Sequence, residues 1–570
     1  MSNTEEAKAD RIDGPRWESL AIENKPTWVL PSPFETYQWS PQPLTVFELT
    51  MHELSWTLRS KPDWQRKAAD PEIRRKWRQE ALEQQATSAE DDAAESNEDD
   101  DSSEVRLTEK MIDYVLAELD GYAKIADNAR GIERACFEAI WYSDRLISTD
   151  LLERLKNAAK ALEDVPDDEK DWHPGSNKQV LDLVHPSLYC VVYGRTHAYL
   201  PGKPHIPANF LPVHVSESIS HWGSRVSNWT SKDFSWMPSD FTVDSDGSVK
   251  LASPYINNLH PVLHRPLYGA IEEVLGAFVP LFERRVSAVS GAPAGGHTRG
   301  GDPPSDEDED EWNEKFWAKI PKILPEAKDY TGQLESQFMP VSLRGRTIQC
   351  IIKLANIHLT PEQPEYAGGS WHVEGMVNEH IVASGIYYYD EENITESMLS
   401  FRVAVGEPSY HGQDDSDCMR MLYDMDRDSD LIQDLGAVVT KAGRALSWPN
   451  IFQHCVSPFE LADPSKPGHR KILAFFLVDP TKDPIVSATD VPPQQAEWAG
   501  EAFEEACRDP TSVLGVLPQE LRDLVKDRFP TTVMTLKEAE AYRLRLMKER
   551  TSSVKSHARE YIRTFNMCEH

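Results

Sequence analysis

Hydrophobic positions recur with a helical period in the first part of the chain. The pattern predicts helices at residues 45–59, 107–127, 132–142 and 150–162, with Thr108 placed to cap the second of them. The apolar stripes are one-sided, as expected for helices that pack on a core. We therefore interpret these stripes as core packing.

Between residues 346 and 480 the pattern changes to that of strands. Five runs are rich in apolar, β-branched and aromatic residues, and turn signals separate them. These predicted strands are residues 349–358, 381–389, 400–405, 437–440 and 471–478. The last run is almost wholly apolar, which predicts burial on both faces. Consecutive strands with few helical periods indicate a β-sandwich or barrel.

From residue 492 the pattern is helical again. Thr535 and Glu538 have the spacing of a capping box, which opens a long C-terminal helix. We predict an α+β protein with a β core between helical and acidic segments. Its parts are a Trp/Pro-rich and helical segment (1–88), an acidic disordered linker (89–104), a mixed, mostly helical domain (105–289), a disordered Gly/Pro-rich and acidic loop (290–312), the β core (313–485) and a helical extension (486–570).

The charge of the chain narrows the range of partners. The 570 residues have a formal net charge of −34. A phosphate backbone would repel such a chain, so we expect no direct binding to nucleic acid. Much of the excess lies in two acidic runs, residues 90–104 and 302–311. Acidic runs are usually solvated and disordered, and docking of a protein partner through them is the alternative.

The seven cysteines are scattered and form no CxxC pair. This pattern indicates neither a disulfide framework nor a zinc knuckle, and reduced thiols fit the cytoplasm or the nucleus. The N-terminus is polar and acidic, without the apolar segment of a signal peptide. No apolar run is long enough to cross a bilayer, so we expect no membrane contact.

The candidate chemistry lies in the β core, where His372 and Glu374 are two residues apart. A His-x-Asp/Glu triplet alone is weak evidence for a metal site, because the composition of the chain gives roughly three such triplets by chance. Here a glycine-containing loop precedes the triplet and a strand follows it, and residues two apart in an extended chain point to the same side. With a second histidine, His454, they could hold one face of an Fe(II) ion and leave the other face open.

Arg470 opens the apolar strand that follows His454. A guanidinium suits a two-point grip on a carboxylate, and a charge that enters so apolar a strand needs a partner. The far carboxylate of a co-substrate is one candidate for that partner. A structural Asp or Glu is the other.

These residues carry a resemblance. Residues 346–480 resemble the double-stranded β-helix of the Fe(II), 2-oxoglutarate-dependent oxygenases, which show His-x-Asp/Glu, a distal His after a Pro-Asn-type turn, and Gly-x-Arg on the last core strand. Most of the chain is also similar to a fungal family known as a domain of unknown function. The strings that carry this likeness are Lys61-Pro62-Asp63-Trp64, Leu107-Thr108-Glu109-Lys110-Met111, Tyr255–Pro261 and Trp371–Tyr389.

The resemblance implies a jelly-roll, cupin-like core with helical additions at both ends. It implies that His372, Glu374 and His454 bind Fe(II), and that Arg470 binds 2-oxoglutarate, with no catalytic residue beyond the metal ligands. Three features depart from the pattern. The carboxylate is Glu where Asp is commoner, no hydroxyl residue stands two positions after Arg470, and a loop at residues 463–467 lengthens the gap to His454.

We expect an oxygenase that oxidises a C–H bond of an unknown small molecule or amino acid. The alternatives are a Jumonji-like protein hydroxylase or demethylase and a non-catalytic metal-binding scaffold. His380 and His411 are competing ligands. Trp371, Tyr387 and Tyr389 could line the pocket, although aromatic residues on strands are more often core.

Overall fold

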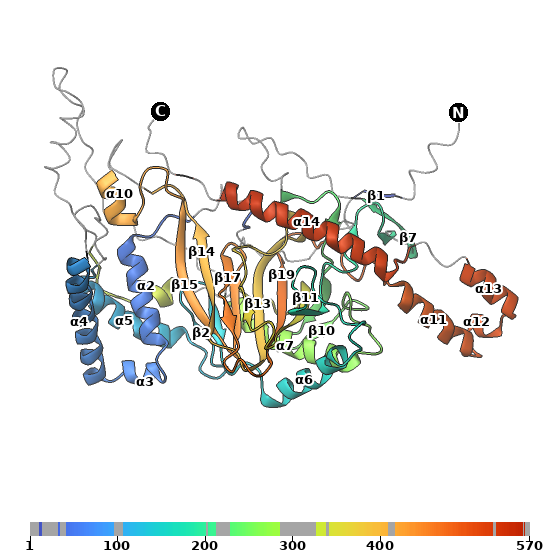
Figure 1. The fold of residues 1–570 in the computed structure, drawn as a ribbon, viewed down its shortest axis with the longest axis horizontal. Coiled ribbons are helices and arrows are strands. Elements are labelled where there is room, and N and C mark those ends of the chain that lie inside the picture. Colours follow the sequence, from blue (N-terminus) through green and yellow to red (C-terminus); the bar gives the residue numbers. More distant parts are fainter. Residues whose placement is uncertain are drawn as a thin grey trace, which may run out of the picture.

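The computed structural model gives the fold of most of the chain (Figure 1). It describes residues 11–13, 32–34, 41–95, 106–200, 203–211, 229–284, 326–337, 341–408, 416–527, 532–561 and 564. His411 and the predicted loop at 290–312 lie outside the described residues.

A large antiparallel sheet forms the centre of the molecule. Its strand order is β10-β9-β11-β19-β13-β16-β3-β2, and β4 pairs with β11 beside this path. The central strands are β11 (Arg346–Leu359), β19 (Gly468–Val478), β13 (Ile381–Glu392) and β16 (Ala445–Pro449). The others are β9 (Ser239–Val243), β10 (Val249–Leu251), β3 (Trp141–Ser143), β2 (Glu133–Arg134) and β4 (Val180–Val184). The strands predicted at 349–358, 381–389 and 471–478 are confirmed.

A second, smaller sheet faces the first. It has the order β15-β14-β17, with strands β14 (Ser397–Ala404), β15 (Ile432–Thr440) and β17 (Gln453–Val456). An isolated bridge between His372 and His454 extends its β17 edge. The Trp448 ring of β16 packs on Phe401 of β14 at a centroid distance of 5.5 Å. We call the face of the main sheet that looks toward β14 the inner face.

Helices cover the opposite face of the main sheet. They are α7 (Arg265–Glu283) and α6 (Thr149–Glu163), which pack against each other below the strands in Figure 1. Phe278 of α7 lies 5.3 Å from the Phe475 ring of β19. At Gly385 of β13 an added Cβ would lie 2.8 Å from Phe278 and 2.9 Å from Phe282. Glycine therefore lets α7 approach the sheet closely.

The N-terminal helices lie beside β15 in Figure 1. They are α2 (Val46–Arg59), α3 (Trp64–Ala68), α4 (Pro71–Glu95) and α5 (Glu109–Ile125). Thr45 and Glu48 form a capping box that starts α2, and the Trp56 indole donates to the Ala437 carbonyl of β15 at 3.1 Å. The helix α4 continues into the segment that the sequence predicts as a linker.

The helix predicted at 132–142 is wrong, because these residues form β2, a turn and β3. Trp141 pairs with Ser447 of β16, and Arg59 of α2 donates hydrogen bonds to the Arg134 and Ala135 carbonyls. Sheet pairing and this guanidinium satisfy the backbone that a helix would have satisfied internally. Pairing with distant segments thus overrides a local apolar pattern.

The C-terminal part is helical, as predicted, with α11 (Ala496–Arg508), α12 (Val513–Val516), α13 (Gln519–Asp527) and α14 (Leu536–Tyr561). Thr535 accepts a hydrogen bond from the Glu538 amide at 3.2 Å, which confirms the predicted cap. The remaining elements are short: β1 (Arg11–Asp13), β5 (Val191–Val192), β6 (His197–Leu200), β7 (Lys203–Leu211), β8 (Phe234–Ser235), β12 (Glu365–Tyr366), β18 (Phe459–Glu460), α9 (Gln333–Gln337), α10 (Ser416–Tyr423) and the 3-10 turn η4 (Val377–Glu379).

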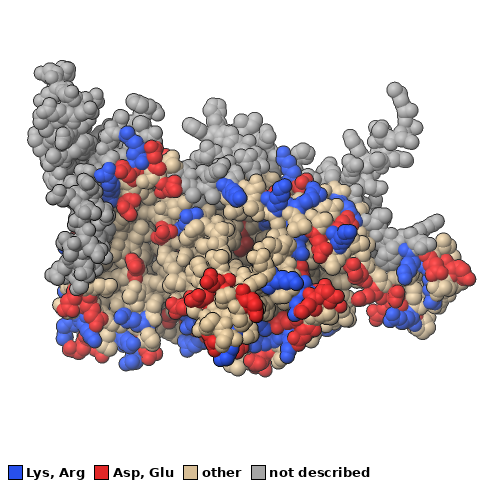
Figure 2. Space-filling view, in the orientation of Figure 1, with Lys and Arg blue, Asp and Glu red and all other residues tan. Residues whose placement is uncertain are grey.

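Two surface properties bear on the predicted partners. Among the described residues, no helix has the length and apolar character needed to span a membrane. On the face shown in Figure 2, acidic and basic side chains are interspersed over the described part of the chain.

Candidate metal centre

The structure brings His372, Glu374 and His454 together at the edge of the second sheet. His372 and His454 exchange backbone hydrogen bonds of 3.2 and 3.0 Å, which place their rings side by side at 4.3 Å. One carboxylate oxygen of Glu374, Oε1, lies 3.6 Å from Nε2 of each histidine. One potential ligand atom from each residue lies within 4.8 Å of the others, so the group is compatible with a metal ion.

Asn450 holds the carboxylate residue in place from behind. Its side chain is fully buried. Its Oδ1 accepts from the Glu374 amide at 2.8 Å, and its Nδ2 donates to the Glu374 carbonyl at 2.9 Å and to the Ile381 carbonyl at 3.0 Å. Because Asn450 lies four residues before His454, a single turn positions two of the three ligands.

The electrostatics of the triad favour a bound cation. Burial would raise the pKa of Glu374, but the two histidines hold it well below its ordinary value. Burial disfavours the charged His372, but the Glu374 carboxylate outweighs this effect and raises the His372 pKa. For His454, burial together with the nearby His372 lowers the pKa to about 4. Metal binding requires these ligand atoms without their protons, so a metal ion and a proton compete for the same position.

The tautomer of His372 fits metal binding. Its Nδ1 lies 2.7 Å from the Ser370 carbonyl, which can only accept a hydrogen bond. Nδ1 therefore keeps a proton, and Nε2, which faces Glu374, is the nitrogen that can offer a lone pair. Metal-ligating histidines usually show this arrangement, with the second ring nitrogen donating to a carbonyl or carboxylate.

A cavity of about 140 Å³ adjoins the triad. His372, Glu374 and Gln453 line one side, and Trp236 and Arg550 line another. Arg550 comes from α14, which also contributes Ser553 and Val554 to the lining. The C-terminal helix therefore forms part of the wall of the site.

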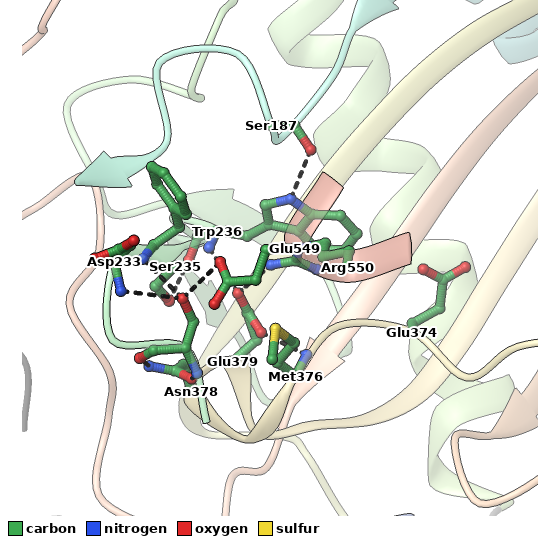
Figure 3. A network of polar contacts seen from close by, with 12 residues as sticks. Ser187, Asp233, Ser235, Trp236, Glu374, Met376, Asn378, Glu379, Glu549 and Arg550 are labelled. Carbon is green, nitrogen blue, oxygen red and sulfur yellow. Dashed lines mark hydrogen bonds and ion pairs between the residues drawn. The ribbon is translucent and has the colours of Figure 1, made fainter. Parts of the chain in front are cut away.

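A polar network fixes this wall (Figure 3). The buried Glu379 carboxylate accepts from the Trp236 amide at 2.8 Å, the Met376 amide at 2.6 Å and Arg550 Nη2 at 2.5 Å. The guanidinium of Arg550 also stacks on the Trp236 ring at 3.8 Å. Sequence patterns do not single out Trp236 or Arg550, because each comes from a segment far from the β core along the chain.

Arg470 lies at the other end of the main sheet. Its Nε and Nη2 donate to Glu391 at 3.2 and 3.1 Å, and its Nη1 donates to the Ser397 hydroxyl at 2.6 Å. Glu391 is the cross-strand neighbour of Arg470 on β13. An acidic residue of this chain therefore occupies the partner position, as the second alternative above expects. The role of Arg470 toward a co-substrate stays a prediction.

The other candidate residues take structural positions. Tyr387 and Tyr389 share the face of β13 that Gly385 turns to α7, and the Tyr389 hydroxyl donates to Asn356 at 3.0 Å. Trp371 packs under the Arg402 guanidinium at 4.5 Å. His380 ends η4 with a left-handed backbone and is not among the clustered ligand atoms.

A second group, His173, Asp182 and His185, also has clustered ligand atoms. His173 Nδ1 lies 2.7 Å from Asp182. His185 Nδ1 accepts from the Ser187 amide at 3.2 Å, so the proton of this neutral ring is on Nε2. Burial lowers the His185 pKa to about 3. Both histidines of this group therefore already have hydrogen-bond partners within the chain.

Comparison with known families shows to which family the chain belongs. Residues 109–502 match the family described as "Protein of unknown function (DUF4246)", and residues 13–80 match "Domain of unknown function DUF4246, N-terminal". The chain belongs to the DUF4246 family. The resemblance to a family of unknown function is thereby confirmed. The triad of this DUF4246 protein lies inside the larger matched region.

Two solved structures have a distant likeness to this DUF4246 protein. The Fe(II)/(alpha)ketoglutarate-dependent dioxygenase TqaL is 12% identical, with a TM-score of 0.22, and the match covers 61% of this chain and 96% of that one. IDO from Bacillus thuringiensis is 10% identical, with a TM-score of 0.19 and coverage of 42% and 75%. TM-scores this low carry no argument. No curated protein matches the chain.

Proposed function

We propose that this protein is a non-haem Fe(II), 2-oxoglutarate-dependent oxygenase that oxidises a C–H bond of a small molecule or amino acid. The convergence of His372, Glu374 and His454 supports this proposal most directly. Two histidines and one carboxylate on one side of an ion are typical of non-haem Fe(II) oxygenases, because the opposite side stays open for reactants.

The order of the strands supports a double-stranded β-helix. Along the chain, the strands alternate between the two sheets: β11, the His372 bridge, β13, β14 and β15, β16, β17, and β19. β11, β13, β16 and β19 belong to the main sheet, and the others to the second sheet. A jelly roll has this alternation. The proposed metal centre lies at one end of the space between the sheets.

Each residue of the site has a defined task in this proposal. His372, Glu374 and His454 would hold the iron, the Ser370 carbonyl orients His372, and Asn450 orients Glu374. Trp236 and α14 limit the access of water to the cavity. The bound iron and 2-oxoglutarate would supply the oxidising power for the C–H bond. Arg470 could bind the far carboxylate only if its ion pair with Glu391 opened.

Anaerobic titration tests the proposal. Protein purified without oxygen should bind Fe(II), and adding 2-oxoglutarate should produce a visible absorbance band. On exposure to oxygen it should release succinate slowly, even without a substrate. His372→Ala should lose the band and the succinate, whereas the nearby His380→Ala should keep both. A wild-type protein that binds iron but gives neither signal would contradict the proposal.

The same assay separates the alternatives. A non-catalytic metal scaffold would bind iron and release no succinate. A Jumonji-like hydroxylase or demethylase would release succinate faster when a basic peptide is added. A cytoplasmic or nuclear location and a protein partner for the acidic segments stay predictions.

A further inference from the structure

A row of three residues crosses the centre of the inner face. In the strand register, Ala474 of β19 lies between Lys353 of β11 and Ile386 of β13. Gly385 and Phe475 point the other way, to α7, and successive strand residues alternate between faces. The Lys353 side chain therefore leaves the sheet on the side of the proposed metal centre.

Side chains at this row are incompletely covered, and we call the space in front of them the hollow. Lys353, Ile386 and the nearby Ile472 lie in central strands, yet each is only partly buried. Their neighbours on the α7 face, such as Leu473, are fully buried. The middle residue of the row is a small alanine. Solvent therefore reaches the space between the sheets at the level of Lys353.

Lys353 brings a positive charge into this hollow. Within the described part of the chain it has neither a hydrogen bond nor an ion pair, although its charge acts on His372 and on the buried Asp182 carboxylate. Two hydroxyls of the same face, Ser384 Oγ and Tyr388 Oη, are buried without a hydrogen-bond partner. Unpaired buried donors are unfavourable, so the hollow is suited to an anion that accepts hydrogen bonds.

The distance from the metal end of the inner face distinguishes Lys353 from Arg470 as a partner for 2-oxoglutarate. Ser384 pairs with Trp448, whose ring contacts His454, so its row marks the metal end of the inner face. The Lys353 row lies two residues deeper, roughly 7 Å. The Arg470 guanidinium contacts Ser397, which lies four residues, roughly 13 Å, along β14 from the row of His454. In 2-oxoglutarate the far carboxyl carbon is three C–C bonds from the keto carbon, about 4 Å at about 1.5 Å per bond. This reach fits the Lys353 row.

We propose that Lys353, rather than Arg470, binds the far carboxylate of 2-oxoglutarate. The inference rests on the proposed function. Tyr388 and Ser384 would add hydroxyl donors above and below the carboxylate, and the pair formed by Arg470 and Glu391 would close the far end of the hollow.

Two ligands of equal length test the assignment. 2-Oxopentanoate has the five carbons and the keto acid of 2-oxoglutarate and lacks the far carboxylate. Both acids are titrated into the anaerobic, iron-loaded full chain, with the absorbance band as the readout. Wild type should prefer 2-oxoglutarate by about 10- to 100-fold, the strength of a hydrogen bond to a charged group. In Lys353→Met this preference should nearly vanish, with unchanged binding of iron and of 2-oxopentanoate.

Two further variants keep the test decisive. Lys353→Arg retains the charge and should keep most of the preference for 2-oxoglutarate over 2-oxopentanoate. This variant still tests the assignment if Lys353→Met folds poorly. Arg470→Met combined with Glu391→Gln removes the distant pair without leaving an unpaired charge, and should also keep the preference. Lys353→Met that still prefers 2-oxoglutarate, or a double variant that does not, would overturn the assignment. If wild type binds neither acid, the proposed function fails and the assignment of Lys353 fails with it.

Discussion

Asn450 connects the backbone of Glu374 to the start of β13, so its loss tests how the triad is held. Asn450→Ala removes the bonds from the Glu374 amide and to the Glu374 and Ile381 carbonyls. The Asn450 amide, which donates to the Val382 carbonyl at 2.9 Å, remains in the variant. The turn should therefore persist while its side-chain contacts are lost.

The expected size of the effect follows from these contacts. A hydrogen bond contributes about 1 kcal/mol net, and a buried group left unpaired costs about 1–3 kcal/mol. Loss of three such bonds should lower the free energy of unfolding by about 3–4 kcal/mol. Because Glu374 is no longer oriented, metal affinity should fall about 10- to 100-fold, as for other residues that support a metal ligand.

Urea unfolding of the metal-free protein and anaerobic iron titration measure the two effects separately. Asn393→Gly is a matched control. The side-chain amide of Asn393 donates to the Asp463, Lys466 and Pro467 carbonyls, away from the triad. The backbone of Asn393 has a φ of 52°, which glycine tolerates. The control should lose stability and keep its iron affinity. An Asn450→Ala protein with wild-type iron affinity would refute the role given to this residue.

Three further predictions concern the stability of the fold. Arg550→Met leaves the buried Glu379 without its cation and should lower the free energy of unfolding, measured in urea, by about 3–5 kcal/mol. Adding Glu379→Gln should restore much of this stability. A double variant that is no more stable than Arg550→Met would contradict the pairing. Gly385→Val would overlap Phe278 and should cost about 1–3 kcal/mol, visible as a lower melting temperature. Burial raises the pKa of Glu118 from 4.5 to about 7. The stabilising contribution of the protonated carboxyl is complete below pH 4.5 and is lost as the pH rises through 7. In wild type, the free energy of unfolding measured in urea should therefore fall by about 3 kcal/mol between pH 5 and 8 because of this group, and Glu118→Gln should remove that decline.

The β core was largely predictable because its strands are continuous apolar runs. β11, β13 and β19 are buried between layers, which requires apolar residues at almost every position. The segment at 132–142 was not predictable in the same way. Its pairing with β16 and its bonds to Arg59 come from distant parts of the chain, so the local pattern favours a helix that does not form.

The candidate site was likewise predictable only where it depends on local sequence. The spacing of His372 and Glu374 is local, and the turn before His454 is visible in the sequence. The wall formed by Trp236 and Arg550 depends on long-range packing that leaves no local pattern. Cross-strand pairing likewise gives Arg470 the acidic neighbour Glu391, which lies 79 positions earlier in the chain.

The central claim is that three side chains bind one ferrous ion. Metal analysis of the anaerobically purified wild type and of His454→Ala tests it most directly. The account predicts about one equivalent of iron in the wild type and almost none in the variant. Full iron occupancy in His454→Ala, with the fold intact, would contradict the account.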